Sequence, residues 1–255
     1  MSQYIFYFAT NSPALRAAGA ALKEAGYTVA AVPGQQVTHL VLPVPSLTPE
    51  GTIKGDGDLS ALLQQLPDAV TIIGGNLPAH LHETHPVIDL LRDARYLAQN
   101  ALITAYCAIR IAMMELPVTL LHCKTLLIGW GRISQCLAQL LGALGADVTV
   151  AARKESDRAM AQALGYQTAD PAKLSGQLHP YRLIFNTAPA PVITEEDSKQ
   201  CNRDCIKIDL ASVLGIGGHH VIWAKGLPGK DAPESSGVLI AQTILRLLQE
   251  KEESL

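Results

Sequence analysis

The sequence has no block of basic residues, no long apolar run and no paired-cysteine motif. Its 255 residues carry a net charge of −3, so nothing in the composition favours binding to a phosphate backbone, and we expect no nucleic-acid partner. No uninterrupted apolar run approaches the roughly 18 residues that a membrane-spanning helix needs. The first ten residues lack the basic segment of a signal peptide. We therefore expect a cytoplasmic protein with no membrane partner.

Metal-binding patterns are also missing. The five cysteines are an odd set without Cys-x-x-Cys spacing, at positions 107, 123, 136, 201 and 205. We interpret them as small buried hydrophobic residues in a reducing compartment. His80, His82 and His85 cluster, but only the last two have a spacing that shares a helix face, and no acidic motif completes a zinc site. We interpret this segment as a polar surface turn and predict no metal.

The apolar content is high, and it follows an alternation of strands and helices. Hydrophobic residues make up 48% of the chain and charged residues 17%, which is typical of a well-buried globular protein. In the first 99 residues the pattern predicts strands, helices and loops of a small doubly wound parallel sheet. The predicted strands are Tyr4–Ala9, Tyr27–Val32, His39–Leu42 and Val70–Ile73, and the predicted helices are Pro13–Ala25 and Leu59–Leu66.

The chain is organised around a glycine turn between a strand and a helix. Leu126–Ile128 is predicted as a buried strand, and Ile133–Leu144 as a helix. Between them, Gly129 permits a tight turn and Gly131 lets the backbone approach a pyrophosphate at the helix N-terminus. Ser134 stands where the dinucleotide-binding fingerprint has its third glycine. The stretch predicts a nucleotide site, with a plain connection between strand and helix as the alternative.

The next strand indicates which nucleotide is bound. Asp147–Ala152 ends about 20 residues past Gly131, where an acidic residue would bind the ribose 2′-hydroxyl of NAD. The sequence has Ala152, Arg153 and Lys154 there, and cations pair with a 2′-phosphate. NADP is therefore the predicted cofactor, unless the two cations only belong to a solvated loop.

Three later loops are expected at the same edge of the second sheet. Strands are predicted at Leu183–Phe185, Ile206–Leu210 and Val221–Ala224, and each runs into a loop, at 186–191, 209–218 and 226–229. Ligands of open parallel sheets bind at the carboxyl ends of the strands. We therefore expect these loops to surround the nicotinamide.

Several of these motifs together resemble the A subunit of dipicolinate synthase, most strongly over residues 96–250. They are Ile128-Gly-Trp-Gly-Arg132, Leu144-Gly-Ala-Asp-Val148, Ala152-Arg153, Asn186-Thr-Ala-Pro189, Asp209-Leu-Ala-Ser212, Gly226-Leu-Pro-Gly-Lys-Asp-Ala-Pro233 and the earlier Leu42-Pro-Val-Pro45. The resemblance implies NADP-linked oxidation of dihydrodipicolinate to dipicolinate in sporulation. It also implies that a flavoprotein-like B subunit is a partner, and we further expect a homo-oligomer.

The same resemblance implies a fold like that of the D-2-hydroxyacid dehydrogenases. We expect a smaller flavodoxin-like α/β domain at residues 1–99 and a Rossmann doubly wound parallel sheet at 100–232, with a bridging helix before it. A C-terminal helix at 233–255 is expected to return to the first domain.

The chain departs from the family pattern where a dicarboxylate substrate should bind. In the segment after Asn100 the pattern has Pro, Glu and Gly where this chain has Ile103, Tyr106 and Cys107, although Thr104 is kept. Ala190 replaces a serine and Val213 an arginine. Because carboxylates are bound by arginine, lysine and hydroxyl donors, these losses make the substrate identity uncertain from sequence.

The candidate site residues follow from these motifs. The predicted catalytic residues are Thr104, Ser212 and His219, since loss of a proton from a dihydropyridine needs a base, and a histidine titrates near neutral pH. His219 and His220 are alternatively two solvated histidines on a glycine-rich loop. The predicted cofactor-binding residues are Gly129, Trp130, Gly131, Arg132, Ile133, Ala152, Arg153, Lys154, Asn186, Thr187, Ala188, Leu210, Ala211, Ser212 and Pro228.

Three functions remain open at this point. The first is an NADP-dependent oxidoreductase of the dipicolinate synthase A type, active alone or only with a B subunit. The second is an NADP-binding regulatory or assembly subunit without catalysis of its own. The third, a 2-hydroxyacid dehydrogenase, would need an arginine and a Glu–His pair that the sequence does not offer in place.

Overall fold

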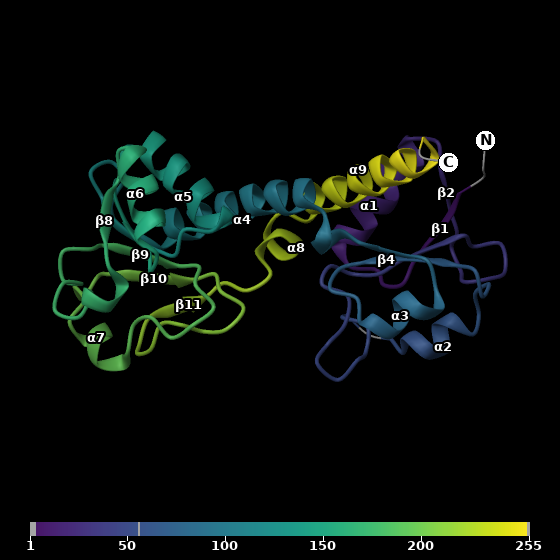
Figure 1. Cartoon of the computed structure of the whole chain (residues 1–255), viewed down its shortest axis with the longest axis horizontal. Helices are drawn as coiled ribbons and strands as arrows, with labels where there is room; N and C mark the ends of the chain where they lie inside the picture. Colours follow the sequence, from purple (N-terminus) through teal and green to yellow (C-terminus); the bar gives the residue numbers. More distant parts are fainter. Residues whose placement is uncertain (1–3, 56, 254–255) are drawn as a thin grey trace. The chain divides into compact units, whose positions relative to one another are not determined.

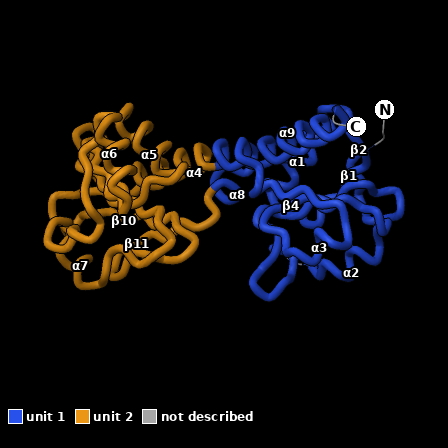
Figure 2. Tube along the Cα trace, in the orientation of Figure 1, with its two compact units in different colours: residues 1–100, 228–255 blue, residues 101–227 orange. Residues whose placement is uncertain are grey.

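The computed structural model describes residues 4–55 and 57–253 and has two compact units (Figures 1 and 2). Unit 1 comprises residues 1–100 and 228–255, and unit 2 comprises residues 101–227. The boundaries predicted from the sequence are after residues 99 and 232. Residues 228–232, which include Pro228, thus fall in unit 1 and not in unit 2.

Unit 1 contains a five-stranded parallel sheet in the order β2-β1-β3-β4-β5. Its strands are β1 (Ile5–Phe8), β2 (Thr28–Val29), β3 (His39–Val41), β4 (Thr71–Gly74) and β5 (Val87–Asp89). This is the strand order of flavodoxin-like folds, so the predicted flavodoxin-like α/β sheet is confirmed, although unit 1 is not smaller than unit 2. The core of one face is formed by buried apolar side chains that include Leu40, Leu42, Ile72 and Leu81.

The helices of unit 1 lie on the two faces of this sheet. They are α1 (Pro13–Glu24), α2 (Leu59–Leu63), α3 (Ala79–Thr84), the short 3-10 helix η1 (Leu90–Arg92) and α9 (Pro233–Glu252), with α8 (Leu227–Asp231) at the unit boundary. Helix α9 packs along α1. A Cβ at Gly237 would lie 2.4 Å from the Ala14 carbonyl oxygen, so the two helices approach closely only because residue 237 has no side chain.

An ion pair joins the C-terminal helix to the start of α4 (Ala94–Glu115) within unit 1. The Asp93 carboxylate accepts a 2.7 Å hydrogen bond from the Tyr96 N–H and another of 2.7 Å from Arg246 on α9. Partial burial raises the pKa of Asp93, but these two bonds outweigh it and hold the pKa below its usual value. Asp93 therefore both begins α4 and holds α9 in place.

Unit 2 contains a six-stranded parallel sheet in the order β11-β10-β9-β6-β7-β8. Its strands are β6 (Lys124–Ile128), β7 (Asp147–Ala151), β8 (Gln167–Ala169), β9 (Leu183–Asn186), β10 (Ile206–Asp209) and β11 (Val221–Trp223). The helices that follow its strands are α5 (Arg132–Ala143), α6 (Glu155–Ala163), the 3-10 helix η2 (Pro171–Lys173) and α7 (Glu195–Lys199). Counted from β6, the order is 6-5-4-1-2-3, which is the order of Rossmann sheets. The predicted Rossmann fold is confirmed.

Four short elements differ from the prediction. The histidine cluster that we interpreted as a polar turn lies on helix α3 and its C-cap, and strand β5, the 3-10 helix η1 and helix α8 were not predicted. Each has three to six residues, too few for a periodic pattern to appear. Strand β5 is held by a tertiary contact, since the Asp89 carboxylate accepts hydrogen bonds of 3.0 Å from the N–H groups of Asn76 and Leu77.

Helix α4 is the one helix among the described residues whose length and mean hydropathy of 1.3 would suit a bilayer. It contains no unbroken apolar run of that length, because Arg110 interrupts the pattern. Ala105, Ala108 and Ala112 on this helix are fully buried in the protein. Only 39% of its apolar stretch is buried, so α4 has one buried and one exposed side.

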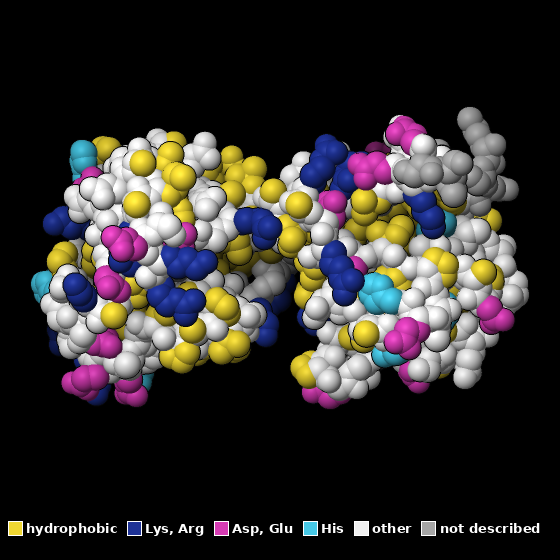
Figure 3. Space-filling view, in the orientation of Figure 1, with side chains coloured by type: hydrophobic (Ala, Val, Ile, Leu, Met, Phe, Trp, Pro, Cys, Tyr) yellow, Lys and Arg dark blue, Asp and Glu magenta, His cyan; other side chains and the backbone are white. Residues whose placement is uncertain are grey.

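Charged side chains are interspersed on the face of each unit that Figure 3 shows. Lysine and arginine lie among aspartate and glutamate there, with no continuous patch of one sign. This mixture agrees with the net charge of −3.

Candidate cofactor site

Four strands of unit 2 end at the same level. Ile128 at the end of β6 pairs with Ala151 of β7 and with Asn186 of β9, and Asn186 pairs with Asp209 of β10. The chain leaves β6 towards β7 on one side and returns through β9 on the other. Ligands of such sheets bind where the strand order reverses, and here that point lies directly beyond Ile128.

The glycine turn occupies this point. Gly129 has φ of +103°, and a Cβ there would lie 2.4 Å from the Thr187 hydroxyl. Gly131 is the N-cap of α5 in an extended conformation, and a Cβ there would meet no protein atom within 4 Å. Protein packing therefore explains Gly129, whereas at Gly131 the absent side chain leaves open space in front of a helix N-terminus, where an anion can approach the N–H groups.

Ser134 does more than replace a glycine. Its side chain is fully buried, and its hydroxyl lies 2.9 Å from the Thr187 hydroxyl, which donates to the Ile128 carbonyl oxygen over 3.1 Å. These bonds tie helix α5 to the ends of β6 and β9. Thr187, predicted to bind cofactor, thus holds the turn in place.

A cavity of about 670 Å³ opens beside the turn. Of the predicted cofactor residues it is lined by Gly129, Trp130, Ala152, Arg153, Lys154 and Ala188. The prediction missed further lining residues that follow β6, β7, β8 and β9, namely Ile128, Ala151, Asp157, Asp170, Pro171, Ala172, Pro189, Ala190, Pro191 and Val192. Such a volume is within the range of small-molecule sites.

The loop after β7 is held by a side chain that no sequence motif indicates. Arg158 on α6 donates 2.7 Å and 2.9 Å hydrogen bonds to the carbonyl oxygens of Ala152 and Arg153. The Arg153 and Lys154 side chains are exposed at this loop. Arg158 therefore fixes the backbone that presents them to the cavity.

Two carboxylates also line the cavity and offset these cations. Asp170 accepts the Ala172 N–H over 3.0 Å as the cap of η2, so part of its hydrogen-bonding capacity is used. Asp157 lies in the first turn of α6. Neither carboxylate lies at the end of β7, the position that contacts the ribose 2′-substituent of a bound dinucleotide. Ala152 occupies that position.

A buried carboxylate, that of Asp209, holds the loops that follow β9 and β10. These two strands lie on the opposite side of β6 from β7. Asp209 is fully buried and accepts hydrogen bonds from the Asn186 side chain at 3.0 Å, and from the N–H groups of Ala211 at 3.0 Å, Gly215 at 2.8 Å and Ile216 at 3.1 Å. Both Asn186 side-chain N–H groups are used, since the second donates to the Ala188 carbonyl at 3.1 Å. Asn186 and Asp209 thus position loops.

The remaining predicted residues do not line this cavity, and they include Gly131, Asn186 and Thr187 of the loops described above. Arg132 and Ile133 form the first turn of α5, and Leu210, Ala211 and Ser212 follow β10, with Ser212 exposed. Thr104 is buried on α4 within unit 2, and Pro228 belongs to unit 1.

The structure does not bring His219 to the cavity. His219 is two residues before the start of β11, so it lies at the amino edge of a sheet whose carboxyl edge carries the glycine turn. It lines a separate cavity of about 210 Å³ together with Cys201 and Lys207. Its loop starts at the carboxyl end of β10, as the prediction requires, but that loop crosses to the opposite edge before position 219. The predicted acid/base role of His219 has no geometric support.

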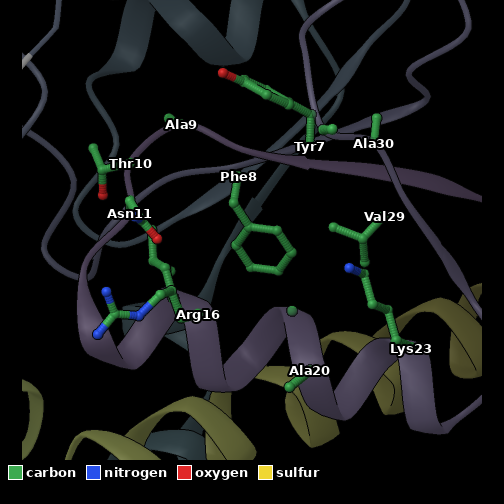
Figure 4. A pocket seen from close by; sticks show the side chains of 13 residues that line it. Tyr7, Phe8, Ala9, Thr10, Asn11, Arg16, Ala20, Lys23, Val29 and Ala30 are labelled. Carbon is green, nitrogen blue, oxygen red and sulfur yellow. The ribbon is translucent and has the colours of Figure 1, made fainter.

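Unit 1 has a cavity of its own, of about 560 Å³, between α1 and the ends of β1 and β2. The Phe8 ring lies between Arg16 and Lys23 in Figure 4. Both cations are exposed, and no predicted site residue lines this cavity. We therefore place the candidate cofactor site in unit 2.

Comparisons with known proteins agree with this fold. No protein-family model matches the chain. The A subunit of dipicolinate synthase from Bacillus subtilis (strain 168) is 24% identical over 238 residues, a match that covers 86% of this chain and 80% of that protein. The crystal structure of the same subunit from Bacillus subtilis matches with a TM-score of 0.80 and 20% identity, over 100% of this chain and 99% of that chain.

Further solved structures extend the comparison. The A subunit of dipicolinate synthase from Bacillus halodurans gives a TM-score of 0.81 at 20% identity, covering 96% of this chain and 97% of that chain. D-lactate dehydrogenase from Escherichia coli gives 0.62 at 13% identity, covering 98% and 97%. The resemblance that the motifs indicated is therefore confirmed: the chain is similar in sequence and in fold to the A subunit of dipicolinate synthase.

Proposed function

We propose that the chain is an NADP-linked oxidoreductase of the dipicolinate synthase A type, which oxidises dihydrodipicolinate to dipicolinate in sporulation. The observation that carries the proposal is the cavity at the switch point of the unit 2 sheet, with open space at Gly131 and with Ala152, Arg153 and Lys154 at the end of β7.

The residues present fit a dinucleotide. The N–H groups at the start of α5 would bind its pyrophosphate, next to the open space at Gly131. Arg153 and Lys154 would pair with a 2′-phosphate, on a loop that Arg158 holds rigid. The loop from Ala188 to Val192, anchored by Asn186, would close the opposite wall. When bound, the nicotinamide would accept the hydride of the substrate.

The substrate-binding residues and the partners belong to the same proposal. We propose a small dicarboxylate substrate, Thr104 and Ser212 as polar groups near it, and Leu210, Ala211 and Pro228 as further cofactor contacts. Aromatisation of a dihydropyridine ring is favourable by itself, so the reaction does not require a strong general base such as His219. A flavoprotein-like B subunit, assembly as a homo-oligomer and a cytoplasmic location complete the proposal.

The first test is an activity assay. The purified chain, alone and mixed with a B-type subunit, is given freshly prepared dihydrodipicolinate and NADP, and NADPH is followed by its absorbance. We expect turnover in at least one of the two preparations. Measurable NADPH binding without turnover in either one would refute the oxidoreductase and favour the alternative, an NADP-binding regulatory or assembly subunit without catalysis of its own.

One observation favours that alternative specifically. Ala190 lines the cofactor cavity where the family pattern has a serine, and Val213 is 55% exposed where the pattern has an arginine. Both positions lack a donor for a carboxylate. A regulatory or assembly subunit would still bind NADP but would not oxidise the substrate, so the activity assay distinguishes it from the oxidoreductase.

The cofactor preference can be tested by itself. We expect Arg153→Ala to weaken NADPH binding by about 10- to 100-fold, because a charge-assisted pair with the 2′-phosphate is worth about 1.5–3 kcal/mol. NADH affinity should not change. Isothermal titration of both nucleotides measures this, with Lys173→Ala, an exposed cation outside the cavity, as the matched control. Equal loss for both nucleotides would contradict recognition of the 2′-phosphate.

A further inference from the structure

A buried lysine lies on the strand next to the edge of the unit 2 sheet. Lys207 on β10 is only 5% exposed, and it pairs in register with Ile184 of β9 and Val221 of β11. Among residues 4–55 and 57–253 it has no carboxylate partner and no hydrogen bond from its ammonium group. Its side chain is mostly buried but lines a cavity, so the positive charge of its ammonium group favours an anion there.

The cavity that Lys207 lines contains a candidate for that anion. Its volume is about 210 Å³, and Lys199, Arg203, His219 and His220 line it together with one carboxylate, Glu195, and with the half-buried Cys201 thiol. The surroundings are therefore predominantly basic, which stabilises a thiolate over a thiol. This cavity is at the amino edge of the sheet and shares no lining residue with the cofactor cavity.

A second thiol lies in the same apolar cluster of unit 2. Cys205 is 2% exposed there, and Cys201 packs against that cluster. The Cys201 sulfur lies 4.0 Å from the Asp197 carbonyl oxygen, and the Cys205 sulfur lies 3.9 Å from the Ile206 carbonyl oxygen. The neighbouring Cys205 thiol, with the charge of Lys207 in addition, lowers the pKa of Cys201 to about 7, against the opposing effects of burial and of Asp197. The same contact and burial raise the pKa of Cys205. Cys201 is thus the thiolate of the pair and Cys205 the thiol.

The chain provides an internal comparison. Cys136 on α5 is also half-buried, but burial raises its pKa, and no cation offsets that effect. The remaining two cysteines, Cys107 and Cys123, are buried. Cys201 and Cys136 are therefore similarly accessible and differ in their electrostatic surroundings.

We propose that Cys201 is a nucleophilic thiol that hydroperoxides oxidise, and that Cys205 captures the product as a disulfide. The Cys201 thiolate sulfur attacks one peroxide oxygen and the O–O bond breaks. Hydrogen peroxide then releases hydroxide, which is protonated to water, and an alkyl hydroperoxide releases alkoxide, which is protonated to the alcohol. The sulfur is oxidised by two electrons to a sulfenic acid, and the peroxide is reduced. The Cys205 sulfur then attacks the Cys201 sulfur, the S–O bond breaks, and water leaves with the Cys205 proton. This site is independent of the cofactor proposed above.

Alkylation tests the nucleophile. Limiting iodoacetamide at pH 7 is followed by peptide mass spectrometry, with Cys136 as the reference thiol. The pKa of Cys201 is lowered to about 7, whereas burial raises the pKa of Cys136. Cys201 therefore has more thiolate at pH 7, and its lower nucleophilicity as a weaker base offsets only part of that advantage, so we expect severalfold faster reaction at Cys201. Equal or faster labelling of Cys136 would overturn the proposal.

The lysine is tested by Lys207→Met, which keeps the apolar stem and removes the charge. We expect the preference for Cys201 to fall towards one; an unchanged preference would overturn the role of Lys207. If this variant does not fold, the rate of alkylation of Cys201 in the unmodified chain is measured against pH. A midpoint near 7 supports the proposal, and a midpoint above about 9, the ordinary range of a thiol, overturns it.

Oxidation tests the pair. After treatment with hydrogen peroxide we expect a Cys201–Cys205 disulfide in the unmodified chain, seen as the loss of two hydrogen atoms from the peptide that contains both. In Cys205→Ala the sulfenic acid has no partner, so dimedone should label Cys201. Preferential oxidation of Cys136, or neither disulfide nor dimedone adduct at Cys201, would overturn the proposal.

Discussion

Replacing Asp209 with alanine is expected to lower the free energy of unfolding of the protein by about 3–5 kcal/mol, the largest effect on stability that we expect from one polar residue. Its carboxylate is fully buried and receives four hydrogen bonds, three from backbone N–H groups of the loop at 211–216 and one from Asn186. Alanine would leave all four donors unsatisfied in the interior. The loss is expected in urea unfolding followed by circular dichroism.

The carboxylate also determines how well the proposed cofactor site is formed. Asn186 receives its orientation from Asp209 and in turn binds both the N–H and the carbonyl oxygen of Ala188, which lines the cavity. We therefore expect Asp209→Ala to weaken NADPH binding even under conditions in which the protein remains folded.

The control for this prediction is an exposed carboxylate of the same unit. Asp204 pairs with Arg182 at 3.6 Å, and its side chain is 64% exposed, so Asp204→Ala should cost less than about 1 kcal/mol. Asp209→Asn is expected to fall between the two, because the amide keeps one acceptor. Equal stability of the Asp209 and Asp204 variants would show that solvent or loop rearrangement replaces the four bonds.

Much of the fold could be predicted because the relevant signals are local. The apolar runs of β6, β7 and β9 and the glycines at 129 and 131 are contiguous in the sequence, and they identify the order strand, turn and helix without tertiary information. Strand β5 and helix α8 could not be predicted this way. They are short, and what stabilises a short element is its contacts with distant segments, such as those of Asp89 with the turn at 76–77.

The cofactor site could be predicted only in part, for the same reason. The spacing of residues in the sequence predicts the glycine turn and the end of β7. The hydrogen bond between Ser134 and Thr187, however, joins residues 53 positions apart, and the one between Asn186 and Asp209 joins residues 23 positions apart. No pattern in a single sequence indicates such pairs. His219 is different, because a residue just before a strand of a parallel sheet lies at the amino edge of that sheet. The strand predicted at 221 therefore already indicated that His219 lies at the edge opposite the glycine turn.

The last prediction concerns Gly131 and separates binding from folding. Gly131 has φ of −81° and ψ of −177°, a conformation that every residue adopts and that β-branched residues favour. A Cβ there meets no protein atom within 4 Å. We therefore expect Gly131→Val to cost less than about 1 kcal/mol in stability, while its side chain fills the space in front of α5 and lowers NADPH affinity by at least about 100-fold, which corresponds to about 2.7 kcal/mol.

Gly129→Ala is the matched comparison in the same turn, because there we expect the substitution to lower stability, unlike Gly131→Val. Its φ of +103° is strained for alanine, and the new methyl group would lie 2.4 Å from the Thr187 hydroxyl, so we expect a loss of about 1–3 kcal/mol in stability. Urea unfolding and nucleotide titration of both variants measure the two effects. If Gly131→Val bound NADPH as tightly as the unmodified chain, the dinucleotide would not bind at this helix N-terminus, and the cavity in unit 2 would have another ligand.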